Sequence, residues 1–193
     1  DASAFSGSVT LNGAGGDDTM IGSAGSDQFN GDSGNDRIEQ NSDATQKLSN
    51  TLIEIGDLVG GVFTATASDG FVSVEEVVMT GGPSNNVIDA GSYDLGDVTI
   101  DGAEGDDTLT GGTRHDSIIG GLGNDKLNAR SGDDVLEGGD GNDSLLGGFG
   151  EDTLIGGDGN DKLNANAGHD ELFGGEGNDR LEGATGDDTI DGG

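Results

Sequence analysis

One apolar residue recurs every nine positions through most of the chain, with polar residues beside it and glycines before it. The longest uninterrupted series runs through residues 102–191, where ten copies all carry an aliphatic residue. These residues are Leu109, Ile118, Leu127, Leu136, Leu145, Leu154, Leu163, Leu172, Leu181 and Ile190. A lone apolar residue between two outward-facing neighbours is typical of a short strand with one buried face. Each repeat therefore predicts a minimal strand of three residues.

The same repeat fills residues 13–39, where three copies carry Met20, Phe29 and Ile38 at the apolar position. The weak alternation of residues 1–12 predicts a leading strand before them. We number the repeat from its first glycine, which places the apolar residue at position eight.

Residues 81–101 hold two degenerate copies, with Asn86 and Val98 at position six, and we expect these copies to bind metal poorly or not at all. Residues 89–108 echo residues 1–19. This echo indicates a longer repeat of about 88 residues and predicts that the chain is part of a tandem array.

Residues 40–80 depart from the pattern, because glycine becomes sparse and β-branched and aromatic residues gather there. Asp69 and Gly70 lie between two alternating runs and predict a hairpin, after a polar connector over residues 40–50. We interpret this insert as a structural spacer, with a binding site for adhesion as the alternative. The predicted organisation has four parts: residues 1–39, the insert 40–80, the degenerate copies 81–101 and the long block 102–193.

The composition points to cations as partners. Asp and Glu number 39 against 7 Lys and Arg, giving a formal net charge of −32, and 41 of 193 residues are glycine. Such a chain repels nucleic acid and anionic membrane surfaces. Cysteine is absent, which excludes disulfides and thiolate metal sites. No apolar run approaches the roughly 20 residues that span a bilayer.

Aspartate occupies position six of every copy outside the degenerate ones. Glycine-rich turns adopt backbone conformations with positive φ, so that carbonyl oxygens can converge on an ion to which Asp supplies charge. Hard oxygen ligands select Ca²⁺ or Mg²⁺, and a flexible carbonyl-rich loop suits Ca²⁺. The candidate metal ligands are Asp18, Asp27, Asp36, Asp107, Asp116, Asp125, Asp134, Asp143, Asp152, Asp161, Asp170, Asp179 and Asp188.

Copies such as GGDGNDSLL, GGLGNDKLN and GGEGNDRLE resemble the nonapeptide of the RTX (repeats-in-toxin, hemolysin-type calcium-binding) family. The resemblance implies an all-β fold, a right-handed parallel β-roll, interrupted here by the β-rich insert. Two repeats would make one coil, with Ca²⁺ between coils, so that Asp residues eighteen positions apart form two stacks. One stack would hold Asp107, Asp125, Asp143, Asp161 and Asp179, and the other Asp116, Asp134, Asp152, Asp170 and Asp188.

The resemblance further implies roughly eight ions in the long block, and more if Asp18 and Asp36 share one. Backbone carbonyls would complete each coordination shell. The carbonyls predicted to do so belong to Gly120, Gly123, Gly138, Gly141, Gly147, Gly150, Gly156, Gly159, Gly174 and Gly177.

No catalytic arrangement is evident, because no HExxH or GxSxG motif and no nucleophile with a poised base is present. We therefore predict that the chain is not an enzyme. His115 and His169 are interpreted as solvated turn residues, too far apart for a shared zinc. Lys126, Lys162 and Arg180, all at position seven, are interpreted as tempering the acidic surface. Ile119, Ile155 and Phe173, at position nine, are either scattered apolar residues or a lateral contact.

The sequence thus predicts an extracellular calcium-binding module of a large secreted or cell-surface protein. It would fold on binding Ca²⁺ and serve as a rigid spacer or as a unit that self-associates, end to end or laterally, into a fibre or surface layer. The alternative is a C-terminal folding and secretion appendage of a secreted hydrolase or toxin. We expect calcium ions as partners, and neither nucleic acid nor a membrane span.

Overall fold

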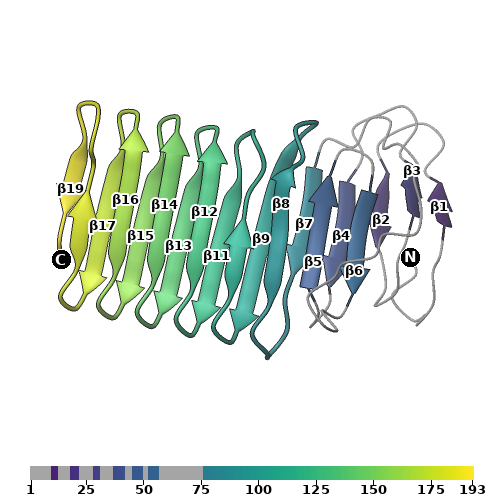
Figure 1. Ribbon diagram of the computed structural model, residues 1–193, viewed down its shortest axis with the longest axis horizontal. Coiled ribbons are helices and arrows are strands. Elements are labelled where there is room, and N and C mark those ends of the chain that lie inside the picture. Colours follow the sequence, from purple (N-terminus) through teal and green to yellow (C-terminus); the bar gives the residue numbers. More distant parts are fainter. Residues whose placement is uncertain are drawn as a thin grey trace.

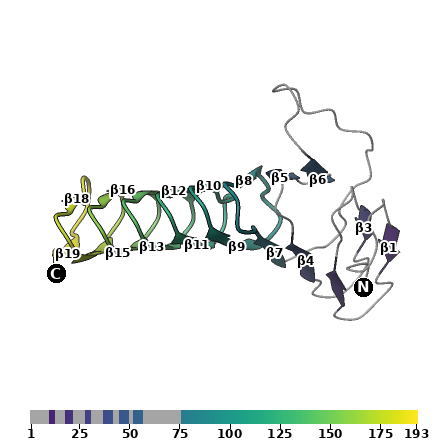
Figure 2. The same cartoon turned by 90° about the horizontal axis from the view of Figure 1, so that it is seen from below.

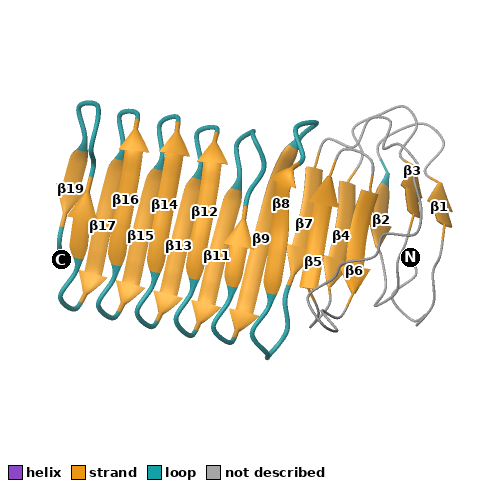
Figure 3. Cartoon of the chain, in the orientation of Figure 1, coloured by secondary structure: helices purple, strands orange, loops and turns teal. Residues whose placement is uncertain are grey.

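The computed structural model describes residues 10–12, 18–21, 28–30, 37–41, 45–49, 52–56 and 76–193. The regular elements within these residues are all strands (Figure 3). Among the described residues there is accordingly no helix long and apolar enough to cross a membrane. Two long sheets lie face to face, and the chain passes from one to the other at each turn (Figures 1 and 2). This arrangement is the predicted parallel β-roll.

The nine-stranded sheet contains, in spatial order, β19 (Thr189–Asp191), β17 (Glu171–Glu176), β15 (Thr153–Asp158), β13 (Val135–Asp140), β11 (Ser117–Leu122), β9 (Asp97–Glu104), β7 (Glu76–Thr80), β4 (Arg37–Asn41) and β2 (Thr19–Ile21). The eight-stranded sheet contains β18 (Arg180–Glu182), β16 (Lys162–Ala167), β14 (Ser144–Phe149), β12 (Lys126–Ser131), β10 (Thr108–Thr110), β8 (Val87–Ser92), β5 (Thr45–Ser49) and β6 (Leu52–Gly56). A separate pair joins β1 (Thr10–Asn12) to β3 (Gln28–Asn30).

From β9 and β10 to the end of the roll, neighbouring strands of each sheet pair in parallel with a register of eighteen residues. Leu127 of β12 lies opposite Leu145 of β14, which in turn lies opposite Leu163 of β16. Each coil therefore contains two repeats, one strand in each sheet. The position-eight side chains of both sheets meet between them, where Leu109, Leu136 and Leu154 are completely buried.

Most strands of the long block are twice as long as the three residues that the sequence predicted. β14 runs from Ser144 through Leu146 and continues over the next two glycines to Phe149. The second glycine of the repeat remains paired with the neighbouring strand at positive φ. Gly121, with φ of 108°, lies opposite Gly139, with φ of 104°. A turn of only three residues therefore remains between strands.

The predicted insert 40–80 is partly built into the roll. β4 pairs in parallel with β7, and β5 pairs in parallel with β8, so these strands continue the two sheets. Residues 45–49, expected within a polar connector, form β5. The antiparallel pairing of β6 with β5 is the departure from the roll pattern among the described strands. The hairpin predicted at Asp69 and Gly70 lies outside the described residues.

Candidate calcium sites

The position-six aspartates lie in two rows along the two edges of the roll. We call the turns that lead into the nine-stranded sheet the first turn row, and those that lead into the eight-stranded sheet the second turn row. The first row holds Asp116, Asp134, Asp152, Asp170 and Asp188, and the second holds Asp107, Asp125, Asp143, Asp161 and Asp179. Asp18 precedes β2, whereas Asp27 and Asp36 lie outside the described residues. These rows match the two expected stacks; calcium binding by each residue remains a prediction.

Oδ1 of each aspartate joins one coil to the next. The backbone N–H of Asp125 donates to Oδ1 of Asp143 at 2.8 Å, and that of Asp143 donates to Oδ1 of Asp161 at 2.8 Å. The first turn row has the same bonds, such as Asp134 N–H to Asp152 Oδ1 at 3.0 Å. The carboxylates are therefore buried and ordered.

Oδ2, the other carboxylate oxygen, is buried without a hydrogen-bond partner along both rows. This holds for Asp125, Asp134, Asp143, Asp152, Asp161, Asp170 and Asp179. A buried polar atom without a partner costs about 1–3 kcal/mol, and more when it is charged. Seven such atoms at regular intervals in one chain indicate positions that a bound cation would satisfy.

The glycine at position one leaves the space that such a cation requires. A Cβ built on Gly138 would collide with Oδ2 of Asp143 and would lie 2.5 Å from the carbonyl oxygen of Gly156. The same pair of oxygens, a carboxylate and a carbonyl from the next coil, surrounds the corresponding points at Gly120 and Gly156. Convergent hard oxygens around a space cleared by glycine fit the ligand preference of Ca²⁺.

The glycines predicted as carbonyl ligands fall into three groups. Carbonyls of Gly120, Gly138, Gly156 and Gly174 border the Oδ2 positions of the preceding coil. Those of Gly123, Gly141, Gly150 and Gly159 are directed at position four of the following coil. No such placement is shown for the carbonyls of Gly147 and Gly177.

Sequence reasoning missed the carbonyls of Ala129 and Ala165. Each lies 3.0 Å from the point where a Cβ on Gly111 or Gly147 would stand, beside Asp116 and Asp152 respectively. Their place in the repeat could have identified them, because Ala129 and Ala165 stand at position one and any residue there has a backbone carbonyl.

The aspartates strongly disfavour the charged state in this setting. Burial, reinforced by repulsion from neighbouring carboxylates, raises the pKa of Asp134 and Asp152 to about 7 and that of Asp143 to about 6. Burial also raises the pKa values of Asp125, Asp161 and Asp170. A divalent cation beside Oδ2 would offset both causes, because it replaces lost hydration and neutralises the repulsion.

Asp116 differs from the rest of its row. Its Oδ1 accepts a hydrogen bond from Val98 N–H at 2.9 Å, and its Oδ2 accepts one from Gly112 N–H at 2.6 Å. Its repeat has Arg114 in place of the position-four glycine, and Arg114 Nε donates to the carbonyl of Asp94 at 3.2 Å. Both oxygens of Asp116 are thus satisfied by backbone N–H groups, so it fits a metal less well than Asp134 does.

The degenerate copies carry no aspartate at position six in either row. Val98 fills this position with a buried apolar side chain in the first turn row, and it pairs with the buried Val77 of β7, which belongs to the insert. In the second turn row, Asn86 is 2% exposed, and its Oδ1 accepts from Gly82 N–H at 2.7 Å. This part of the roll has an apolar core instead of a carboxylate row.

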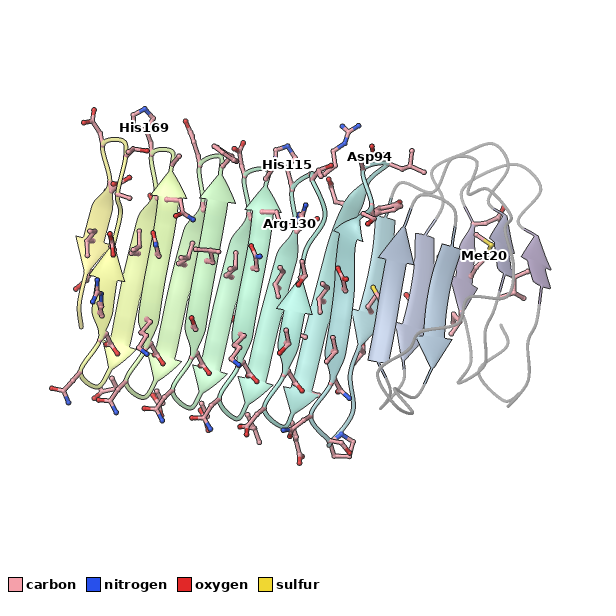
Figure 4. All side chains as sticks on the ribbon, viewed as in Figure 1. Met20, Asp94, His115, Arg130 and His169 are labelled. Carbon is pink, nitrogen blue, oxygen red and sulfur yellow. The ribbon has the colours of Figure 1, made fainter. Side chains whose placement is uncertain are left out.

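The side chains at position five form an exposed hydrogen-bonded ladder. Asn142 donates to Oδ1 of Asn124 through its backbone and its side chain, at 3.0 and 3.1 Å. His115 and His169 occupy this position on the other edge of the roll (Figure 4). Their Nδ1 atoms each accept a backbone N–H at 3.0 Å, from Asp133 and Asp187 respectively.

Within the described residues, no three His, Cys, Asp or Glu side chains converge as a metal cluster.

The fold and these sites define a parallel β-roll with one carboxylate per turn and carbonyls for the remaining ligands. The family model described as RTX calcium-binding nonapeptide repeat matches more than half of the chain. The matched residues are 7–38, 80–113, 101–136, 110–145, 137–172, 146–181 and 173–193. The chain therefore belongs to this family, as its repeats predicted. The comparison with curated proteins gave no match.

Proposed function

We propose that the chain is a structural module that folds when Ca²⁺ binds between its coils. In this role it serves as a rigid spacer or self-assembling unit of a large secreted protein, such as a fibre or surface layer. The observation that carries this proposal is the set of seven buried Oδ2 atoms without partners, repeated along both turn rows. RTX repeat proteins are generally structural and typically secreted, which agrees with this role.

Each residue type has a separate task in calcium-dependent folding. Oδ1 of Asp143 aligns its coil with the preceding one, while Oδ2 and the carbonyl of Gly156 offer oxygens to the ion. Leu145 and Leu154 close the core between the sheets. The bound Ca²⁺ supplies positive charge that the carboxylate rows require in order to lie close together.

The ion count follows from the rows. We expect about seven ions in the long block, rather than the eight predicted from the repeats, because both oxygens of Asp116 are satisfied. At free Ca²⁺ one hundred times Kd, each site contributes about 2.7 kcal/mol to folding. Extracellular calcium modules bind in the range of about 10⁻⁴–10⁻³ M, so folding would follow exposure to extracellular calcium.

The test is far-UV circular dichroism of the 193-residue chain in excess chelator, in millimolar Mg²⁺ and in millimolar Ca²⁺. We expect the β signal to appear with Ca²⁺, and isothermal titration calorimetry to report several ions per chain. The same β signal in chelator as in Ca²⁺ would show that folding does not depend on calcium. A large signal in Mg²⁺ alone would assign the sites to the smaller ion.

A further inference from the structure

The outer surfaces of the two sheets carry opposite charge, although the chain as a whole is strongly acidic. Strands β10, β12, β14 and β16 contain no carboxylate, and with β18 they carry Lys126, Arg130, Lys162 and Arg180, all exposed. Arg180 forms an ion pair at 3.3 Å with Glu182 of its own strand, the one carboxylate in these five strands. We call these four residues the basic face. Four of the seven Lys and Arg residues of the chain therefore lie on one sheet surface.

The nine-stranded sheet shows the complementary composition. From β9 to β19 its strands contain no Lys or Arg. Their outward positions seven and nine carry carboxylates, apolar side chains and, at most copies of position seven, Thr or Ser. We call this set the acidic face: Asp101, Ile119, Glu137, Ile155, Glu171, Phe173 and Asp191. Ile119 and Phe173 are each 36% exposed, so the apolar part of this face is open to solvent.

The spacing of the charges along the roll axis matches between the faces, although Glu171 is offset from Glu137 by two residues along the strand direction. Lys126 lies opposite Ser144, and Ser144 opposite Lys162, so the two lysines are two strands apart. Glu137 of β13 and Glu171 of β17 are also two strands apart. Strands lie about 4.8 Å apart, which makes both separations roughly 10 Å along the roll.

Both sheets are flat along the long block, with strands that run nearly parallel from β9 to β19 (Figures 1 and 2). Flat sheets of many strands are unusual and are typically stabilised by stacking or by side-chain ladders. Arg130 lies near the end of β12, close to the turn edge that carries His115 (Figure 4). Each flat surface thus offers a regular row of charges to a second flat surface.

We infer that the basic face of one copy of this chain docks on the acidic face of a second copy, sheet against sheet. Lys126 and Lys162 then meet Glu137 and Glu171, while Ile119, Ile155 and Phe173 pack against the neighbouring sheet. The two surfaces in this contact differ, so a pair of copies still has one free basic face and one free acidic face. Such a contact does not close on itself, and copies stack laterally into layers.

This inference rests on the proposed calcium-dependent folding, because the unfolded chain has no faces. Calcium also reduces the repulsion between copies, since about seven bound Ca²⁺ ions would change the net charge from −32 to about −18. Five strands of about six residues give a face of roughly 20 by 24 Å, and a contact of about 1,000 Å² in total. This area is at the low end for specific interfaces, so the association is weak and sensitive to salt.

The experiment is a charge exchange followed by sedimentation velocity in millimolar Ca²⁺. One variant carries Lys126→Glu and Lys162→Glu, and the other carries Glu137→Lys and Glu171→Lys. We expect the wild-type chain to associate with rising concentration at low salt. Each variant alone should associate at least about tenfold more weakly, because both of its faces then carry the same sign. An equimolar mixture of the two variants should restore association.

A control variant, Asp158→Lys with Glu176→Lys, makes the same change of net charge as Glu137→Lys with Glu171→Lys, at the exposed last residues of β15 and β17. It should keep or strengthen wild-type association. Circular dichroism of every variant in Ca²⁺ separates lost folding from lost docking, and Lys126→Gln with Lys162→Gln gives a milder version of the first variant. A folded wild-type chain that stays monomeric to millimolar concentration would overturn the inference. So would a mixture that associates no better than its components, or a polyanion, such as heparin, that binds the basic face while copies stay apart.

Discussion

Asp143 accepts the backbone N–H of Asp125 at 2.8 Å through Oδ1, while its Oδ2 is buried and has no hydrogen-bond partner. One carboxylate therefore has two separable roles. Oδ1 aligns consecutive coils, and Oδ2 is the atom that a bound ion would contact. A substitution that keeps an acceptor but removes the charge should affect the second role and spare the first.

Asp143→Asn is that substitution. We expect the variant to bind fewer Ca²⁺ ions and to lose about 3 kcal/mol of stability at free Ca²⁺ one hundred times Kd. Calcium titration calorimetry and urea unfolding in Ca²⁺ measure the two effects. Asp158→Asn, at the exposed last residue of β15, is the matched control and should change neither. Equal ion counts for Asp143→Asn and wild type would remove Asp143 from the candidate ligands.

A site can also be added where the repeat has lost its charge. A Cβ on Gly81 would meet both Oδ1 of Asn86 and the carbonyl of Gly102, as at the calcium positions of the long block. In Asn86→Asp one carboxylate oxygen can keep the bond from Gly82 N–H, while the second oxygen, which replaces the amide nitrogen, is added for the ion. The variant should therefore add one Ca²⁺ ion per chain, counted by native mass spectrometry.

Val98→Asp provides the contrast. It places a carboxylate in the apolar part of the first turn row, where the neighbouring Asp116 is already satisfied by backbone N–H groups. We expect no added ion and a loss of stability, because a buried charge without a partner is costly. If Val98→Asp gained an ion and Asn86→Asp gained none, the space beside the position-one glycine would not be where the ion binds.

Without calcium, the roll should become more stable as the pH falls from 8 to 5. The pKa values of Asp134 and Asp152 are raised to about 7 in the folded state, against about 3.9 for an unfolded aspartate. The folded state therefore binds more protons between about pH 4 and 7, and its stability decreases as the pH rises through that window. Saturating Ca²⁺ should reverse the trend, because protons compete for the same oxygens.

Thermal melts followed by circular dichroism, in calcium-free buffer and in millimolar Ca²⁺, measure both trends. We expect a higher melting temperature at pH 5 than at pH 8 without calcium, and a lower one with it. A calcium-free β signal that weakens on acidification would show that the buried carboxylates do not control the stability of the metal-free fold.

His115 should be replaceable by asparagine. Its Nδ1 accepts the N–H of Asp133 at 3.0 Å, and Oδ1 of Asn124 accepts the N–H of Asn142 at the same distance. His115→Asn should then change the free energy of unfolding by no more than about 0.5 kcal/mol. Calorimetry should detect no difference in zinc binding between this variant and wild type. A loss of zinc affinity would assign His115 a ligand role.

The sequence predicted most of the roll because Asp143 and Leu145 recur at a fixed interval, and one period gives both the register and the buried positions. It did not predict the strand length, because the glycines after Leu146 satisfy a turn and a strand at positive φ equally well. Nor did it predict that Gly112 N–H satisfies Asp116, since that contact depends on a turn conformation around Arg114. Continuation of the two sheets through β5 and β7 was missed for a related reason. Their residues pair through backbone groups, which need no repeat motif.

Glycine at position four should be required by the approach of neighbouring coils. Gly141 has φ of 140°, and a Cβ there would collide with the carbonyl of Gly123 in the preceding coil. Gly141→Ala should therefore cost at least about 2 kcal/mol, from strain at positive φ and from separation of the coils. Gly192→Ala is the control, because a Cβ at Gly192 meets nothing within 4 Å. Urea unfolding in saturating Ca²⁺ compares the two variants. Equal midpoints would show that position four tolerates a side chain, and that the repeat keeps glycine there for a reason other than coil spacing.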